Sequence, residues 1–252
     1  MEKEIFIVGI GPGNIQMMTN QAQEILKQSD IIVGYKTYVE LIKKYFPAKE
    51  FVSSSMREEL KRCELCFNYA LENKKVSLIC SGDPGIYGMA SPMFEMQQKN
   101  PLYKEVEIFV IPGITAASSG SAILGAPLNN DFCVISLSDL MTPWSVIEKR
   151  LLAAFQGDFA ISIYNPSSHK RKNYLKRACE ILLNAGAKKT RACAYVENIG
   201  REGTKTKVCT LDELKNCDVN MFTTVFIGNS QTEIFQNQNQ DKKLITKRGY
   251  KI

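Results

Sequence analysis

Histidine is almost absent from this sequence: His169 is the only one in 252 residues. A Ser-His-Asp triad or a histidine-rich zinc site would depend on that single residue, so neither is expected. Cysteine is more frequent, with eight residues. Cys63 and Cys66 form a lone CxxC with no second pair, and we therefore predict no metal site.

Long hydrophobic runs are also missing. No stretch approaches the roughly 20 uninterrupted apolar residues that span a bilayer, and no basic N-terminal region precedes an apolar core. We expect a cytoplasmic protein with no membrane partner. Hydrophobic residues make up 44% and charged residues 23%, which is typical of a globular protein with a sizeable core. Cysteines within or beside apolar runs are expected to be core residues of a reducing compartment: Cys80, Cys133, Cys193 and Cys209.

The stretch 106–128 organises the rest of the chain. Residues 106–111 form an almost unbroken apolar run, which predicts a strand buried on both faces of a parallel sheet. Pro112 and Gly113 end this strand, and a run of small residues from Ile114 to Ala122 predicts a helix. A strand that ends in Pro-Gly and opens such a helix is typical of the ligand-binding edge of an open α/β sheet.

Two other predicted strands, 4–10 and 76–80, also end in glycine-rich turns: GIGPG at 9–13 and SGDPGIYG at 81–88. The first turn does not fit a dinucleotide fingerprint, because Asn14 holds the place of the third glycine. The commonest methyltransferase fold has an acidic residue, which binds the cofactor ribose, where this chain has Ile7, so that fold does not match either. Pro12 lacks an N–H donor and fixes φ, so we expect this turn to be a rigid border of the site and not a loop that binds phosphate.

Alternating strands and helices predict α/β architecture throughout, with domains at 1–125 and 126–252 and a linker at 125–131. The second half is expected to repeat the architecture of the first, and the polar segment 236–243 is expected to be mobile. Further strands are predicted at residues 31–33, 132–137, 159–164, 191–196, 205–209 and 223–227. Helices are predicted at residues 20–28, after Thr19 as N-cap, and at 57–72, 144–155, 169–184 and 211–216.

With these motifs in place, the chain resembles the tetrapyrrole methylases, S-adenosylmethionine-dependent enzymes of corrin and siroheme synthesis. The resemblance covers nearly the whole length, through GIGPG, SGDPGIYG, PGITAASSGSAILGAPL at 112–128, YNPSS at 164–168 and YVENIGREG at 195–203. It is most similar to the branch that methylates C17 of precorrin-3B or cobalt-factor III, through GYKTYVELI at 34–42, SSMREE at 54–59 and ITKRGY at 245–250. It departs from the family pattern at Asn14 and Lys247.

The resemblance implies the tetrapyrrole methylase fold: two α/β domains with the cofactor in the cleft between them, usually as a homodimer. The cofactor is S-adenosylmethionine, with S-adenosylhomocysteine as product. Carried over residue by residue, the implied cofactor-binding residues are Pro12, Ser81, Gly82, Asp83, Ile86, Thr115, Ala116, Asn165, Ala194, Thr223 and Thr224.

The implied function is C17 methylation with ring contraction in cobalamin biosynthesis. Candidate contacts to the carboxylate-edged macrocycle are Ser54, Met56, Arg57, Tyr87 and Arg171. Three alternatives stay open: another corrin-pathway methylase, a ribosomal RNA 2′-O-methyltransferase of the same fold, and a non-enzymatic nucleotide-binding module. The net charge of +6 is small for a strongly salt-dependent RNA binder, so we expect no nucleic-acid partner.

Overall fold

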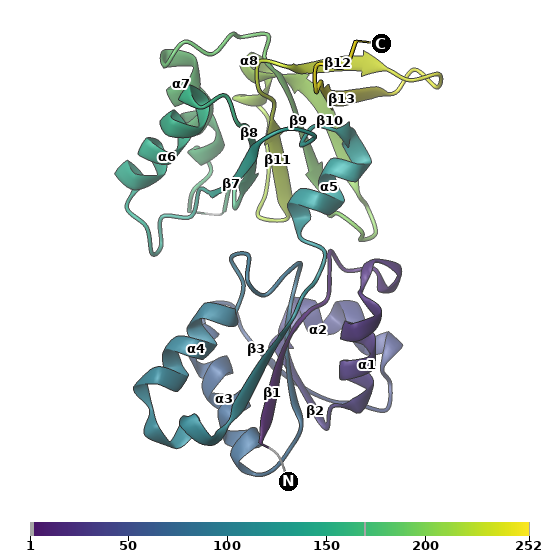
Figure 1. The fold of residues 1–252 in the computed structure, drawn as a ribbon, viewed down its shortest axis with the longest axis vertical. Helices are drawn as coiled ribbons and strands as arrows, with labels where there is room; N and C mark the ends of the chain where they lie inside the picture. The colour runs from purple at the N-terminus through teal and green to yellow at the C-terminus, as the bar shows by residue number, and fades with distance from the viewer. Residues whose placement is uncertain (1–2, 169, 252) are drawn as a thin grey trace. The chain divides into compact units, whose positions relative to one another are not determined.

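The computed structural model describes residues 3–168 and 170–251, so His169 lies outside the described residues. The chain forms two compact units, Met1–Ala116 and Ala117–Ile252 (Figure 1). Within the described ranges, no helix is both long and apolar enough to cross a lipid bilayer.

The sheet of the first unit is parallel and has the strand order β3-β2-β4-β1-β5. Its central strands β1 and β4 are buried along nearly their whole length, because helices cover both faces of the sheet (Figure 1). The parallel arrangement brings the carboxyl ends of all its strands to one edge. The strands are β1 (Glu4–Gly9), β2 (Ile31–Tyr35), β3 (Glu50–Ser54), β4 (Val76–Cys80) and β5 (Glu107–Ile111).

On one face lie α1 (Asn20–Gln28) and α2 (Lys36–Ile42), and on the other α3 (Glu59–Leu71) and α4 (Ala90–Lys99). The predicted start of α1 is confirmed, since Thr19 Oγ1 accepts the N–H of Ala22 at 3.1 Å. Short 3-10 helices span Ile15–Met17, Lys43–Tyr45 and Pro101–Glu105.

Two expectations for this unit are wrong. Strand β5 is an edge strand, with Val110 40% exposed, so it is not buried on both faces. Helix α3 begins at Glu59, because Arg57 has a φ of 69° in the left-handed region and ends any helical path there.

The sheet of the second unit has the order β10-β9-β11-β8-β7 and is mixed. Strands β7 and β8 are parallel, whereas β11 runs antiparallel to β8 and β9, and β10 runs antiparallel to β9. The expected repeat of the first architecture is therefore wrong for the sheet. The connection from Glu197 to Lys205 is too short for the crossover of about a dozen residues that parallel neighbours need. The strands are β7 (Phe132–Ser136), β8 (Ala160–Tyr164), β9 (Ala192–Glu197), β10 (Lys205–Thr210) and β11 (Thr223–Ile227).

One face of this mixed sheet packs against α6 (Trp144–Gln156), α7 (Tyr174–Asn184) and α8 (Leu211–Leu214). Helix α7 starts later than the predicted residue 169. Helix α5 (Ala116–Leu124) lies on the other face (Figure 1). Its small residues allow a close approach, since a Cβ added to Gly120 would lie 2.8 Å from the ring of Phe226.

The C-terminal segment forms a hairpin of β12 (Thr232–Gln236) and β13 (Lys242–Thr246), and β13 pairs with β6 (Gly125–Ala126). The segment 236–243, expected from its composition to be mobile, forms the turn and the adjoining strand ends of this hairpin. Its polar residues form the turn, where Asn237 Oδ1 accepts the N–H groups of Asn239 at 3.0 Å and Asp241 at 2.8 Å.

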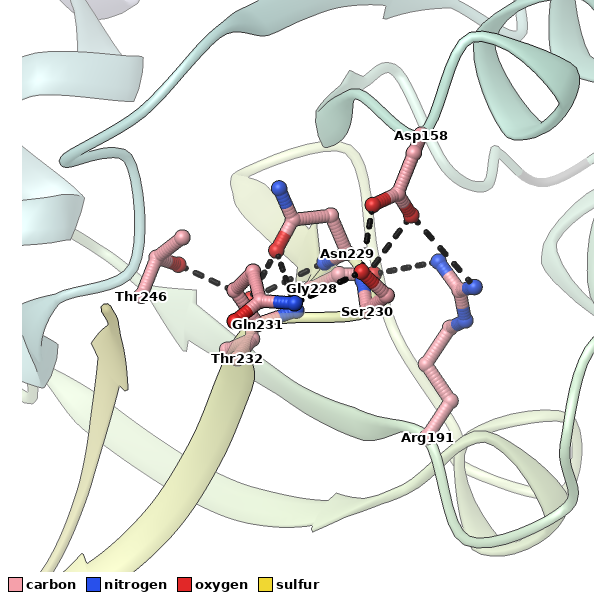
Figure 2. A network of polar contacts seen from close by, with 8 residues as sticks. All are labelled: Asp158, Arg191, Gly228, Asn229, Ser230, Gln231, Thr232 and Thr246. Carbon is pink, nitrogen blue, oxygen red and sulfur yellow. Dashed lines mark hydrogen bonds and ion pairs between the residues drawn. The ribbon is translucent and has the colours of Figure 1, made fainter. Parts of the chain in front are cut away.

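A polar network fixes the start of this hairpin (Figure 2). The hydroxyls of Thr232 and Thr246 lie 2.8 Å apart, and Thr246 Oγ1 also donates to the Pro127 carbonyl at 2.6 Å. Asp158 accepts the N–H of Ser230 at 2.9 Å. The hairpin is thereby tied both to the segment after α5 and to the turn that precedes β8.

Candidate active site

Three glycine-rich loops meet at the carboxyl edge of the first unit's sheet. The loops after β1 and β4 are joined by a pair of backbone hydrogen bonds. Gly82 N–H donates to the Gly11 carbonyl at 2.7 Å, and Gly11 N–H donates to the Gly82 carbonyl at 3.2 Å. The predicted convergence of these motifs is therefore present in the fold.

The glycines are needed because the three backbones touch. A Cβ on Gly113 would lie 2.1 Å from the Gly82 carbonyl oxygen. A Cβ on Gly9 would lie 2.6 Å from the Gly113 nitrogen. Contacts this short exclude any side chain. The motif glycines therefore pack one loop against another, which is a different task from cradling a phosphate.

Asp83 locks the junction of these loops. Its Oδ1 accepts the N–H of Gly85 at 2.8 Å within its own turn, and its Oδ2 accepts the N–H of Gly113 at 3.0 Å from the loop after β5. The side chain is only partly buried. A carboxylate held by two N–H donors is fixed in orientation and keeps free lone pairs for a further donor.

The other cofactor candidates of this unit lie around the same junction. Pro12 is buried, Ser81 is half-buried, and Ile86 is 38% exposed. A Cβ built on Gly82 would lie 3.6 Å from Thr115 Cα and 3.9 Å from Ala116 N, so these segments are in contact. The structure thus brings the predicted residues of the first unit to one edge.

The turn after β3, residues 54–58, carries three of the predicted substrate contacts. Met56 is 43% exposed, and Arg57 is exposed with its left-handed φ. The Ser55 N–H donates to Glu58 Oε2 at 2.7 Å, and this bond is the main cause of a lowered pKa of Glu58. The turn is therefore held at its backbone while Met56 and Arg57 face solvent.

Arg62, on α3, holds the same turn from inside and was not among the predicted site residues. Its Nε donates to Ser54 Oγ at 2.8 Å and its Nη2 to the Ser55 carbonyl at 3.0 Å. Arg62 is only 4% exposed. The sequence does contain a signal for this role, because Arg62 lies on the apolar face of an amphipathic helix, next to Cys63 and Cys66. A charged side chain that is buried there needs hydrogen-bond partners.

The same guanidinium also reaches the loop after β4. Arg62 Nη1 lies 3.9 Å from Met89 Sδ, directly after the SGDPGIYG turn. Tyr87 in that turn is 57% exposed, with a φ of 54°. Arg62 therefore connects the turn that bears Met56 and Arg57 with the loop that bears Tyr87.

In the second unit, the predicted residues gather where β8 ends and β11 begins. Asn165 follows β8 with a φ of 52°, and its Nδ2 donates to Ser136 Oγ at the end of β7, at 2.9 Å. Thr223 and Thr224 open the antiparallel β11 and are buried. Ala194 lies one step into the sheet, opposite Phe226, and is fully buried.

Tyr164, also in the YNPSS motif, fixes the first turn of α5. Its hydroxyl oxygen accepts the N–H of Ala117 at 2.7 Å. The first N–H groups of a helix have no partner within it, so the phenol acts as a cap supplied by a distant strand. This motif therefore positions a helix terminus as well as Asn165.

Arg171 is held by neighbours of its own unit. Its Nη1 donates to Ser138 Oγ at 2.9 Å and Asp139 Oδ1 at 3.1 Å, and its Nε donates to Ser168 Oγ at 3.0 Å. A hydrogen bond from Tyr174, followed by that from Arg171, lowers the pKa of Asp139. The positive charge of Arg171 is partly neutralised by this ion pair.

No cluster of His, Cys, Asp and Glu residues with metal-binding geometry occurs in the ranges 3–168 and 170–251.

Comparisons with known proteins agree with this arrangement. The tetrapyrrole (corrin/porphyrin) methylase family matches residues 4–215. A probable cobalt-factor III C(17)-methyltransferase of Salmonella typhimurium is 42% identical, over 98% of this chain and 99% of that protein. A precorrin-3B C(17)-methyltransferase of a Sinorhizobium species is 35% identical, over 99% of this chain and 98% of that protein.

Among solved structures, the methyltransferase CobJ superposes with a TM-score of 0.84 at 34% identity, covering 91% of this chain and 95% of that one. The expected fold class of α/β units is confirmed by this similarity. The family match extends over most of the chain and through every motif loop at the carboxyl edge of the first sheet. The chain is thus a member of the tetrapyrrole (corrin/porphyrin) methylases.

Proposed function

We propose that this protein transfers a methyl group from S-adenosylmethionine to C17 of precorrin-3B or cobalt-factor III, with ring contraction, in cobalamin biosynthesis. The observation that carries the proposal is near full-length similarity to two relatives named for this reaction, at 42% and 35% identity. The junction of three glycine-rich loops supplies a rigid edge on which such a reaction can be organised.

The residues at this junction fit the polar part of S-adenosylmethionine. At this edge we expect a ligand to contact Ser81, the Asp83 carboxylate, which two N–H donors hold in place, and the backbone near Thr115. Asp83 suits the cofactor's ammonium or ribose hydroxyls, which donate hydrogen bonds. Pro12, Gly82, Ile86 and Ala116 complete the proposed set in this unit, and Asn165, Ala194, Thr223 and Thr224 are proposed for the adenine side.

For the tetrapyrrole, we assign the exposed apolar side chains of Met56 and Tyr87 to the flat ring and Arg57 to a peripheral carboxylate. Exposed apolar groups at a ligand edge are typical of sites that bind large planar molecules. An arginine forms two parallel hydrogen bonds with a carboxylate. Ser54 and Arg171 are also proposed as substrate contacts. Ser54 already accepts a hydrogen bond from Arg62, and Arg171 already donates one to Asp139.

The sulfonium of the cofactor supplies a methyl group that is already activated. The protein therefore has to align donor and acceptor carbon and exclude water. The backbone bonds at Gly11, Gly82 and Gly113 serve this purpose by fixing the loops before any ligand arrives. Homodimer formation and a cytoplasmic location also belong to this proposal.

The test is incubation with S-adenosylmethionine and each candidate tetrapyrrole, with and without cobalt, followed by mass spectrometry. A mass gain of one CH₂ unit on precorrin-3B or cobalt-factor III supports the proposal. Methylation of a different corrin intermediate would show that the protein catalyses another methylation step of the corrin pathway.

Ribosomal RNA serves as the competing substrate. An RNA enzyme loses affinity steeply with salt, with a slope of about −0.7 per neutralised single-strand phosphate. Tetrapyrrole binding should survive moderate salt, because ring contacts supplement its few charge contacts. Strong salt-sensitive RNA binding without tetrapyrrole binding would overturn the proposal.

A further inference from the structure

The proposed methyl transfer makes no use of the motif GYKTYVELI at 34–42. The motif begins in β2 and continues through α2, and Tyr35 is the last residue of the strand. Strand β2 lies between β3 and β4 in the sheet. Because these strands are parallel, Tyr35 lies between the turn 54–58, which carries proposed tetrapyrrole contacts, and the loop 81–88, which carries proposed cofactor contacts.

The strand register places Tyr35 beside Ser54. These two residues are paired, and on the other side of β2 Gly34 is paired with Ile79 of β4. Neighbouring strands lie about 4.8 Å apart, and paired residues of parallel strands point to the same side of the sheet. Tyr35 is therefore next to the Ser54 hydroxyl, which accepts the Arg62 Nε–H at 2.8 Å.

Tyr38, in the first turn of α2, holds the ring of Tyr35 in place. The two ring centroids lie 5.2 Å apart at an interplanar angle of 88°, which is an edge-to-face contact. A single ring in this geometry covers at most one face of Tyr35. Tyr35 is half-buried. It is thus an oriented aromatic side chain at the carboxyl edge of the sheet.

On the basis of the proposed function, we propose that Tyr35 contacts the ring system of the tetrapyrrole and sets its position relative to the cofactor loop. Flat conjugated rings pack favourably on aromatic side chains, either stacked or edge-on. Met56 and Tyr87, which are assigned to the same ring system, are 43% and 57% exposed. The half-buried Tyr35 is the deepest of the three, and its contact with Tyr38 makes it the best suited to orient a rigid macrocycle.

The experiment titrates cobalt-factor III and precorrin-3B into the protein saturated with S-adenosylhomocysteine and follows the tetrapyrrole absorbance. Tyr35→Leu should weaken tetrapyrrole binding by about three- to tenfold, the value of one aromatic contact. Tyr35→Phe keeps the ring and should bind like the parent. The affinity for S-adenosylhomocysteine, measured by calorimetry, should be unchanged in both variants, whereas a general loss of structure would lower it as well.

Tyr45→Leu is the matched control. Tyr45 is 38% exposed on the 3-10 helix Lys43–Tyr45, which leads to the amino end of β3 at the opposite edge of the sheet. The same substitution there should leave both affinities at the values of the parent. An equal loss of tetrapyrrole affinity in Tyr45→Leu and Tyr35→Leu would overturn the proposal.

A second measurement uses the parent protein and does not depend on how a variant folds. N-acetylimidazole acetylates accessible tyrosine hydroxyls, and mass spectrometry of the peptides locates them. Bound tetrapyrrole should protect Tyr35 and leave Tyr45 reactive. Equal acetylation of Tyr35 with and without tetrapyrrole, or no acetylation of Tyr35 in the free protein, would contradict the assigned contact.

The parent protein also separates this proposal from the proposed function. If the parent binds neither tetrapyrrole, the proposed function fails. If the parent binds one of them and Tyr35→Leu binds it equally well, only the role of Tyr35 is overturned. The stacking role is overturned as well if Tyr35→Phe loses as much affinity as Tyr35→Leu, because the hydroxyl and not the ring then carries the effect.

Discussion

The carboxylate of Asp83 accepts the backbone N–H of Gly113 at 3.0 Å and so ties the loop after β4 to the loop after β5. Asp83→Ala leaves this N–H and that of Gly85 without their acceptor. We expect a loss of stability of about 1–3 kcal/mol and the loss of most of the increase in melting temperature that S-adenosylhomocysteine gives the parent. Thermal denaturation over a ligand series measures both.

Asp83→Asn separates the two roles of this side chain, since its amide keeps one acceptor oxygen but loses the charge. It should be more stable than Asp83→Ala and still bind S-adenosylhomocysteine weakly. Parent-like affinity of Asp83→Ala in calorimetry would remove Asp83 from the cofactor site.

Gly113→Ala tests the backbone packing of the three loops. Its Cβ would lie 2.1 Å from the Gly82 carbonyl oxygen, so a backbone segment must shift. We expect destabilisation of several kcal/mol, or failure to fold, in urea denaturation. The control is Gly203→Ala, where φ is 74° but no atom lies within 4 Å of the added Cβ. It should cost only about 1–2 kcal/mol from backbone conformation.

Two substitutions of Arg57 test whether this residue contacts the substrate or only shapes the turn. Arg57→Lys should weaken tetrapyrrole binding by about 1–3 kcal/mol, because a lysine does not form the two parallel bonds, and should leave S-adenosylhomocysteine binding unchanged. Arg57→Gly should stabilise the fold by up to about 1 kcal/mol, since the residue has a φ of 69°, yet it should bind tetrapyrrole as poorly. If both variants titrate the tetrapyrrole like the parent, Arg57 is only a turn residue.

Arg62→Met replaces a buried guanidinium with an apolar side chain of similar length. Ser54 Oγ and the Ser55 carbonyl then lose their donor, at a cost of about 1–3 kcal/mol in stability. Tetrapyrrole affinity should fall with the loosened turn, while S-adenosylhomocysteine affinity changes little. Leu60→Met, at a 65% exposed position on the same helix, is the control and should match the parent. A parent-like tetrapyrrole affinity in Arg62→Met would contradict this role.

The Asp139 ion pair predicts a pH dependence of stability. Tyr174 and Arg171 lower the pKa of Asp139 in the folded protein, so its ionised form stabilises the fold above the ordinary pKa. That contribution disappears as the pH falls through the lowered folded-state pKa. The difference in melting temperature between the parent and Asp139→Asn should therefore be largest near neutral pH and shrink toward about pH 3.

Much of the fold was predictable because apolar periodicity and glycine-rich turns agree along the first unit. Strand β4 and the Thr19-capped helix have the predicted bounds. The edge position of β5 was not predictable, because an apolar run does not reveal which strand is last in a sheet. Strand direction in the second unit depends likewise on connections whose geometry leaves little trace in composition.

Candidate site residues that lie in sequence motifs could be predicted from the sequence. Residues whose role depends on packing contacts could not. The motifs correctly predicted that Asp83 and Asn165 lie at the ends of strands, as their hydrogen bonds show, and their role in cofactor binding stays a prediction. Arg62 was missed, because helical arginines usually face solvent and only its partners identify it as buried. The hairpin was missed because Asn and Gln residues that look like a disordered tail serve there as turn residues.

During synthesis, β6 can pair with β13 only after all the strands between them have been made. Gly125 and Ala126 leave the ribosome long before their partners Leu244 and Ile245 are synthesised. All the strands of the first unit precede residue 116, so that unit has its complete sheet while the second is still being translated. A nascent chain halted before β13 therefore carries a finished first sheet and a β6 segment without its strand partner, and limited proteolysis of stalled chains should cleave selectively after α5.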